Sequence, residues 1–316
     1  MLTILHRFSF LILFFCVSCC ASVKENAERQ DSQVLKDLKV LSSDEYEGRK
    51  TGTAGAEKAA AFIADRFKSL DLEHFPQGED YIQTFQFDDK EGTSYSGKNI
   101  IGYIPGKLKE VLVISAHYDH LGKVGDSIYN GADDNASGIA ALLQFAAYFS
   151  ENKPNFTIVF AAFDAEEMGL RGAKAFVENP PIRLDQIKLN INMDMISHND
   201  KNELYVCGTY KYPQLRRYVE DIKDEVKVKL LLGHDDPNTG HDDWTNQSDQ
   251  GAFNAKDIPF LYFGVEDHKD YHQPSDTYEN INPTFYVEAV DAILNVIRNI
   301  DNKFSSQIQI DKNKVM

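Results

Sequence analysis

Five short segments of the sequence carry side chains of the kinds that bind divalent metals. They contain two histidines, His117 and His272, and three carboxylates, Asp134, Glu167 and Asp194. Imidazoles and carboxylates without thiolates are typical ligands of zinc or another divalent transition ion, whereas calcium prefers an all-oxygen cage and magnesium keeps much of its water. The sequence therefore predicts a transition-metal site, provided that the fold brings the five segments together.

Two further carboxylates stand beside these residues. Asp119 lies two positions after His117, where it can orient the imidazole and fix its tautomer. Glu166 directly precedes Glu167, and at the end of a strand one of the two side chains can face a metal while the other faces a substrate. A carboxylate in that place can take a proton from water and pass it to a leaving amine, so Glu166 is the candidate general base.

Each segment has an ordinary structural interpretation when it is taken alone. A His-x-Asp pair is usually a hydrogen-bonded pair, adjacent glutamates are usually solvated, and the turn at 133–135 can cap the helix that follows it through Asn135. The metal interpretation depends on all five segments together, because several carboxylates in one cleft repel one another unless cations neutralise them. We interpret the remaining histidines as structural or surface residues: His6, His74, His120, His198, His234, His241 and His268.

Apolar patterns predict the elements that position these side chains. Continuous apolar runs are typical of strands buried on both faces, and they occur at 111–116, 157–163, 188–193 and 259–263. Apolar residues at helical spacing predict helices at 54–70, 139–149 and 170–178 and from Pro283 onward. Alternating strands and helices indicate an α/β fold, a mostly parallel twisted sheet flanked by helices on both faces.

The candidate residues follow the predicted strands directly. In open α/β sheets, ligands bind at the carboxyl ends of the strands. His117 ends the first run, Glu166 and Glu167 follow the second, and Asp194 follows the third. These side chains are therefore expected at one edge of the sheet.

The first 20 residues predict an export signal. Arg7 precedes an apolar run at 8–17 that is too short to span a bilayer as a helix. The Val-Ser-Cys-Cys stretch at 17–20 also resembles a bacterial lipoprotein cleavage site, with lipid attached to Cys19 or Cys20. We expect an exported protein, either periplasmic or anchored to the outer membrane as a lipoprotein, and otherwise secreted. Membrane contact is expected only through that lipid.

The rest of the chain predicts a single domain. We expect a polar linker at 21–32, one catalytic domain at 33–303 and a frayed polar tail at 304–316, because no repeat or long linker divides the sequence. Outside the signal region only Cys207 remains, too few cysteines for an internal disulfide, and we expect a buried thiol. The formal charge of −16 argues against nucleic-acid binding, because an acidic surface repels phosphates.

Taken together, these segments resemble the co-catalytic zinc peptidases of family M28, and their aminopeptidases in particular. The resemblance extends from Glu47-Gly-Arg49 to His272-x-Pro-x-Asp276, with the five segments in the family's order. It implies the α/β sandwich of the zinc exopeptidases, which is similar to the phosphorylase/hydrolase fold. It also implies peptide substrates and two zinc ions per chain, or another divalent transition metal in the cell.

The resemblance also assigns roles to residues. Asp134 bridges the two metals, His117 and Asp194 share one of them, and Glu167 and His272 share the other. Glu166 is the general base and Asp119 the partner of His117. The family's peptide bond between residues equivalent to Asp134 and Asn135 is cis.

One segment departs from the family. Where the family often has Ser-Asp-His before the final strand, this chain has Ser248-Asp249-Gln250. Gln250 takes a substrate-side or structural position rather than that of a metal ligand. The departure leaves the substrate preference open, and no substrate-binding residue is assigned.

We predict an exported di-zinc aminopeptidase that removes N-terminal residues from peptides. A carboxypeptidase or dipeptidase on the same scaffold needs basic residues that bind a terminal carboxylate, and no arginine cluster stands beside the motifs. A single-zinc glutaminyl cyclase of similar fold, and a non-enzymatic binding module that has lost its ligands, are less favoured because the five-residue set is complete.

Palmitate labelling tests the lipoprotein interpretation. The wild-type chain is expected to incorporate radiolabelled palmitate in a bacterial host. The double variant Cys19→Ser/Cys20→Ser is expected to lose the label because it lacks the acceptor thiol, whereas a Cys16→Ser control keeps it. Undiminished label in the double variant would end this interpretation.

Overall fold

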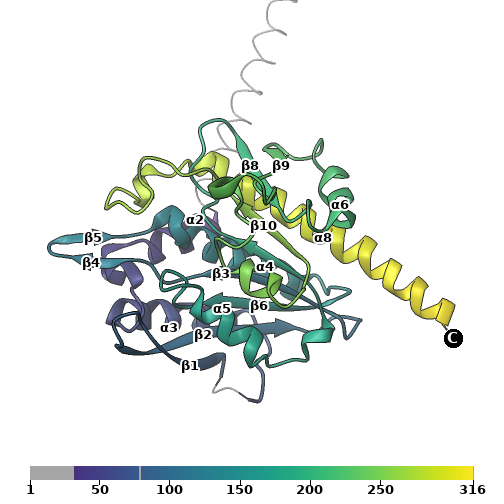
Figure 1. Ribbon diagram of the computed structural model, residues 1–316, viewed down its shortest axis with the longest axis horizontal. Coiled ribbons are helices and arrows are strands. Elements are labelled where there is room, and N and C mark those ends of the chain that lie inside the picture. The colour runs from purple at the N-terminus through teal and green to yellow at the C-terminus, as the bar shows by residue number, and fades with distance from the viewer. Residues whose placement is uncertain (1–31, 78–79, 316) are drawn as a thin grey trace, which may run out of the picture.

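The computed structural model describes residues 32–77 and 80–315. The predicted signal segment and nearly all of the predicted linker lie outside the described residues. In the described part, helices pack on both faces of an eight-stranded sheet (Figure 1). The α/β fold class predicted from the sequence is confirmed.

The parallel strands lie in the middle of the sheet. The strand order is β1-β2-β6-β3-β7-β10-β8-β9. β6, β3, β7 and β10 run parallel to one another, β2 and β8 are antiparallel to their inner neighbours, and the outer strands complete the sheet. The bounds are β1 Ile82–Asp88, β2 Ser94–Ile104, β3 Val111–His117, β6 Thr157–Phe163, β7 Ile187–Met193, β8 Glu203–Cys207, β9 Lys229–Leu232 and β10 Phe260–Gly264. A separate hairpin joins β4 (Gly122–Val124) to β5 (Ser127–Tyr129).

The four apolar runs correspond to the four central strands. Every residue of β3 and β10 is buried, and β6 and β7 are buried at nearly every position. Helices cover both faces of these strands, so side chains that point either way must be apolar. The predicted helices correspond to α3, α4, α5 and α8, with shifts of one or two residues at several ends.

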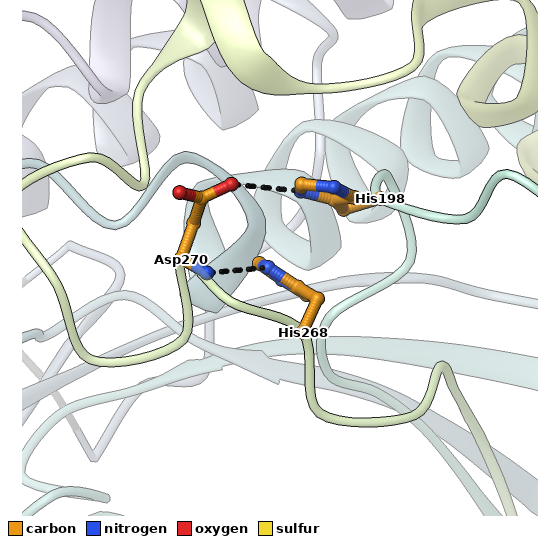
Figure 2. Close-up of side chains that lie close together, drawn as sticks. All are labelled: His198, His268 and Asp270. Carbon is orange, nitrogen blue, oxygen red and sulfur yellow. Dashed lines mark hydrogen bonds and ion pairs between the residues drawn. The ribbon is translucent and has the colours of Figure 1, made fainter.

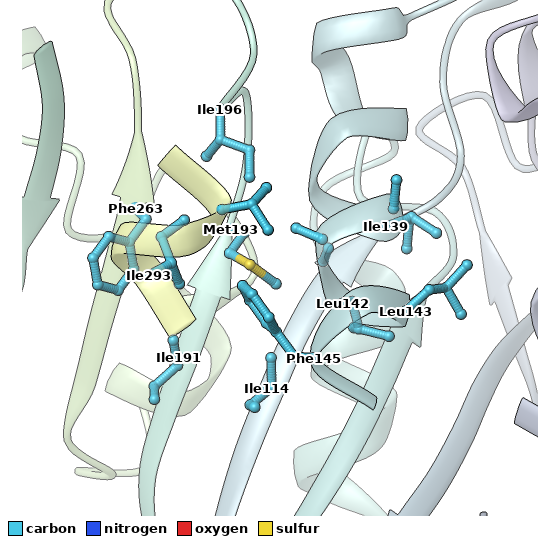
Figure 3. Packing of buried hydrophobic residues seen from close by; sticks show 14 of the residues in the cluster. Ile114, Ile139, Leu142, Leu143, Phe145, Ile191, Met193, Ile196, Phe263 and Ile293 are labelled. Carbon is cyan, nitrogen blue, oxygen red and sulfur yellow. The ribbon is translucent and has the colours of Figure 1, made fainter. Parts of the chain in front are cut away.

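The helices divide unevenly between the two faces. One core cluster joins α2, α3, α4 and α8 to the sheet, and a second joins α5 and α7 to the opposite face. Figure 3 shows Leu142 and Phe145 of α4 in the larger cluster, with Ile114, Ile191 and Met193 of the strands. The bounds are α2 Gln33–Leu41, α3 Ala54–Ser69, α4 Gly138–Glu151, α5 Arg171–Glu178, α6 Arg216–Glu220, α7 Gln250–Asn254 and α8 Pro283–Val315.

The C-terminal segment differs from the expected frayed tail. α8 continues to Val315, through most of the stretch at 304–316, and is the long helix at the right of Figure 1. No glycine or proline follows Pro283, so no residue breaks the helix. Across the described residues, no helix has both the length and the apolar composition needed to cross a membrane.

The single cysteine of the described region is buried, as expected. Cys207 ends β8 and is fully buried against Phe260 and Tyr262. Burial raises the pKa of its thiol well above the ordinary value. The thiol therefore stays protonated and serves as packing.

Candidate active site

The ends of three neighbouring strands and two loops converge on one cleft. His117 is the last residue of β3, Glu167 follows β6, and Asp194 follows β7 directly. Asp134 comes from the loop before α4, and His272 from the loop after β10. The structure thus brings the five predicted ligand residues together from segments that span most of the described chain.

Asp134 lies between two groups of ligand atoms. On one side, His117 Nε2 is 3.4 Å from Asp134 Oδ1 and 3.2 Å from Asp194 Oδ1. On the other side, His272 Nε2 is 3.1 Å from Asp134 Oδ2 and 3.4 Å from Glu167 Oε2. Each oxygen of Asp134 therefore faces a different imidazole, which is the geometry of a bridging carboxylate.

The spacing of these atoms fits zinc. Two ligand atoms at about 2.1 Å from a tetrahedral zinc lie about 3.4 Å from each other. The four distances around Asp134 are close to that value. His117 is 1% exposed and Asp134 4% exposed, so these two donors are buried, whereas the side chain of His272 is 37% exposed.

Burial and mutual repulsion shift the pKa values of these groups. Burial raises the pKa of Asp134, and the charge of Glu167 adds to the rise. Burial alone would lower the pKa of His117, but the charges of Asp194 and Glu166 outweigh it and raise this pKa well above its ordinary value. Burial likewise opposes protonation of His272, yet its hydrogen bonds to Asp134 and Glu167 raise its pKa to about 10. Protonated imidazoles thus balance the carboxylates of the cleft.

Glu166 has the properties of a proton acceptor. Burial raises the pKa of its carboxyl well above the ordinary value, although the charge of His117 acts in the opposite direction. Its backbone N–H donates to Asp119 Oδ1 at 2.9 Å, and the N–H of Glu167 donates to Asp119 Oδ2 at 3.3 Å. Asp119 therefore holds the backbone that carries both glutamates.

The bond between Asp119 and His117 differs from the one expected. His117 Nδ1 donates to the backbone carbonyl of Asp119 at 3.1 Å, while the nearer carboxylate oxygen of Asp119 is 3.7 Å away. The carboxylate is instead used by the two backbone N–H groups after β6. Asp119 thus orients the imidazole through its main chain and the glutamates through its side chain.

The loop before α4 is held by residues on both sides. The Asp134–Asn135 peptide bond is cis, as the resemblance implied. Asp276 accepts the backbone N–H groups of Asp133 at 2.9 Å and Asp134 at 3.1 Å. Asn135 Oδ1 accepts the N–H of Gly138, the first residue of α4, at 2.9 Å and thus satisfies one N–H at the start of the helix, whose N-cap residue is Ser137.

A buried arginine ties these loops to the N-terminal part of the domain. Arg49 is 1% exposed, and its guanidinium donates to backbone carbonyls at 2.6–2.8 Å. The acceptors are Leu41, Tyr118, Asn130 and Gly131. Burial lowers the pKa of Arg49 to about 10, and the charges of Asp134 and Asp276 oppose that shift. Arg49 thus places a positive charge behind the carboxylates and fixes the loops that carry them.

A second cluster of histidines supports the same loop. His198 and His268 stack with ring centroids 3.9 Å apart, beside Asp270 (Figure 2). His268 Nε2 donates to Asp133 Oδ2 at 2.9 Å, and its Nδ1 accepts the N–H of Asp270 at 3.3 Å. Both ring nitrogens of His268 are therefore engaged with the protein's own chain. Through its bond to Asp133, His268 ties the loop after β10 to the loop before α4.

Two residues near the centre were missed in the sequence. His120, which we placed among the structural histidines, has a buried ring whose Nδ1 lies 2.8 Å from Glu167 Oε1. Asp249 is fully buried with neither carboxylate oxygen hydrogen-bonded, and burial raises its pKa to about 8. The sequence signal for His120 was its place in the run from His117 to His120, and the signal for Asp249 was its place in the segment at 248–250. In both segments the family resemblance assigns roles to other residues only.

Gln250 occupies a structural position. It is fully buried, its Oε1 accepts from Asn192 at 3.0 Å, and its Nε2 donates to the carbonyl of Trp244 at 2.8 Å. It therefore ties β7 to the loop before α7. A cavity of about 510 Å³ adjoins the site and is lined by Asp119, His120 and Glu167 together with Tyr95, Met168 and Arg171.

Comparison with known proteins identifies the family of the chain. Residues 99–297 match the model of peptidase family M28. The chain belongs to peptidase family M28. It is thus a hydrolase of the metallopeptidase class, and the M28 resemblance stated from the sequence is confirmed.

Several relatives and solved structures are similar to this M28 peptidase. Aminopeptidase YwaD of Bacillus subtilis is 28% identical over 218 residues, covering 65% of this chain and 45% of the relative, so the chain spans about half of its length. The structure of a zinc aminopeptidase from Bacillus subtilis is similar with a TM-score of 0.67 at 19% identity, covering 84% of this chain and 93% of the other. A glutaminyl cyclase from Bacteroides thetaiotaomicron gives 0.69 at 18% identity, covering 84% and 97%. These structural likenesses establish the fold.

Zinc binding is expected to release protons. The raised pKa values of His117 and His272, the latter about 10, mean that both imidazoles carry a proton at pH 7, and a metal must displace it. Zinc affinity of the chelator-treated protein should therefore rise with pH toward 10 and fall below pH 7. Calorimetric zinc titrations in two buffers of different ionisation enthalpy measure the release. A His272→Asn control should release fewer protons, and heats independent of the buffer would contradict the prediction.

Replacing the buried arginine should destabilise the domain. Arg49→Lys keeps the charge but cannot reach all four carbonyls, and buried hydrogen bonds to charged groups contribute roughly 1.5–3 kcal/mol each. We expect the free energy of unfolding to fall by about 3 kcal/mol in denaturant titrations. The exposed Arg183→Lys serves as the matched control and should change little. Equal stability of the two variants would remove Arg49 from this role.

Proposed function

We propose that this M28 peptidase is a di-zinc aminopeptidase that removes N-terminal residues from peptides. One observation carries the proposal: the two oxygens of Asp134 face separate groups of ligand atoms. A carboxylate shared in this way supports two metals, because a single ion would use only one of the groups. We propose His117, Asp194 and Asp134 for one zinc, and Glu167, His272 and Asp134 for the other.

Residues of the chain then transfer the proton of the attacking water. When bound, a zinc pair polarises the scissile carbonyl and makes a water molecule more acidic. Glu166 takes the proton from the attacking water and passes it to the leaving amine. Its raised pKa supports this role, because a base with a pKa nearer to neutrality both accepts and returns a proton readily. Asp119 keeps Glu166 in place through the backbone.

The charge of the cleft favours substrates with a free amino terminus. Glu166 is not assigned to a zinc, and its carboxylate provides negative charge that attracts a substrate ammonium. A carboxypeptidase needs instead a cation that binds a terminal carboxylate. Arg171 lines the neighbouring cavity, but its Nε donates to the carbonyl of Met168 at 3.1 Å and its ring neighbour is Phe87. It is therefore engaged with its own chain.

The glutaminyl cyclase alternative rests on fold likeness alone. The ligand atoms of His117, Asp134 and Asp194 form one buried group, and those of Glu167 and His272 lie on the other side of Asp134, which both groups share. This favours two metals over one. Metal analysis of the purified, fully active enzyme distinguishes the aminopeptidase from the glutaminyl cyclase. One zinc ion per chain would favour the cyclase.

We also propose that the enzyme is exported and carries a lipid at Cys19 or Cys20. The support is the charge and apolar pattern of residues 1–20. The palmitate experiment described above tests this part of the proposal.

A panel of free and blocked substrates tests the activity. Amino-acid nitroanilides with a free amine should be cleaved, and their N-acetyl counterparts should react at least about 100-fold more slowly, because they lack the ammonium. Glu166→Gln is expected to bind zinc as the wild type does and to lose about 10²–10⁴-fold in kcat. Glu178→Gln, a change outside the cleft, is the control. Cleavage of blocked peptides alone would overturn the proposal.

A further inference from the structure

His120 is a buried histidine without a role in the site described so far. Its side chain is wholly inaccessible, and Nε2 has no hydrogen-bond partner among the described residues. The ring's other nitrogen, Nδ1, points at the carboxylate of Glu167. Among the described residues, the hydrogen-bond partner of the ring is thus a residue that we propose as a zinc ligand.

His120, Asp134 and Glu167 lie close enough together to hold a metal ion, and the individual distances favour a hydrogen bond between His120 and Glu167 instead. Pairs of proposed ligand atoms lie 3.1–3.4 Å apart, near the spacing expected around one zinc. His120 Nδ1 is closer to Glu167 Oε1, at 2.8 Å, and farther from Asp134 Oδ2, at 3.6 Å. The short distance is typical of a charge-assisted hydrogen bond, and the long one is outside hydrogen-bond range.

Glu167 uses its two oxygens for different partners. Oε2 faces His272 at 3.4 Å, within the proposed zinc group, while Oε1 faces His120. Because Nε2 of His120 has no acceptor, the ring proton belongs on Nδ1, where Glu167 accepts it. Hydrogen bonds from His120 and His272 lower the pKa of Glu167 well below its usual range, against the effect of burial.

The backbone fixes the ring of His120 in this position. Gly131 has a φ of +56°, and a Cβ at that residue would lie 2.6 Å from Cδ2 of His120. The glycine therefore lets the ring pack directly against the main chain. The N–H of His120 also donates to the carbonyl of Arg49 at 3.4 Å. The imidazole is held on two sides and directed toward Glu167.

We propose that His120 is a positioning residue for Glu167: its Nδ1–H binds Oε1 and thereby presents Oε2 to the zinc shared with His272 and Asp134. The inference rests on the proposed two-zinc function and deepens it. Partners of this kind, which hold a metal ligand without binding the metal, typically contribute 10–100-fold to metal affinity. His120 is therefore expected to strengthen the zinc on the Glu167 side and to leave the zinc near His117 nearly unaffected.

Zinc competition with a chromophoric chelator tests this role in the full-length protein. His120→Leu should weaken one of two zinc affinities by about 10–100-fold. His120→Asn should recover most of the lost zinc affinity, because its side-chain amide N–H lies at the position of the Nδ1–H of histidine. His120→Gln should not recover this affinity, because its amide N–H lies nearer to the position of Nε2. The exposed His74→Leu is the control. Equal affinities for the Asn and Gln variants, or wild-type affinity for Leu, would overturn the proposal.

Cobalt spectra distinguish positioning from direct ligation. If His120 does not touch the metal, the cobalt-loaded Asn variant should keep the wild-type visible absorption bands. Loss of those bands in the Asn variant would make His120 a ligand and overturn the inference. Both readouts are independent of catalysis. If the wild-type protein binds fewer than two zinc ions, the proposed two-zinc function is contradicted. The difference in zinc affinity between the His120→Asn and His120→Gln variants tests the role of His120 alone.

Discussion

Carboxylates crowd together at the carboxyl ends of β3, β6 and β7, and their mutual repulsion governs the structure around them. Burial removes the water that would screen these charges, so each carboxylate needs a cation, a proton or several N–H groups nearby. The fold supplies all three. Arg49 stands behind the cleft, the imidazoles of His117 and His272 carry protons within it, and the donor spacing around Asp134 accommodates two divalent ions.

The carboxylates around the centre fall into two sets with different partners. Asp134, Glu167 and Asp194 point their oxygens at imidazole nitrogens and form the proposed ligands. Asp119 and Asp276 accept backbone N–H groups and so shape the loops that carry the ligands. This division explains why so many acidic residues lie at one place. Some are the proposed metal ligands, and others hold the backbone that carries those ligands in position.

The fold by itself does not decide the reaction of this M28 peptidase. Solved structures of a zinc aminopeptidase and of a glutaminyl cyclase are similar to it to nearly the same degree. The distinction lies in the site, where the groups on both sides of Asp134 are complete. The carboxylate of Glu166, which is not assigned to a metal, then favours hydrolysis at a free amino terminus as the proposed function.

The sequence by itself determined the central strands and the residues that follow them. Runs such as 111–116 are apolar throughout because helices cover both faces, and polar residues at their ends can only lie at the sheet's edge. β1 alternates between half-buried and exposed residues, so it lacked that signal. Only the tertiary structure decided that His120 meets Glu167, 47 positions away, and that the carboxylate of Asp119 binds backbone N–H groups. Such contacts arise from the packing of distant loops, and local spacing carries no information about them.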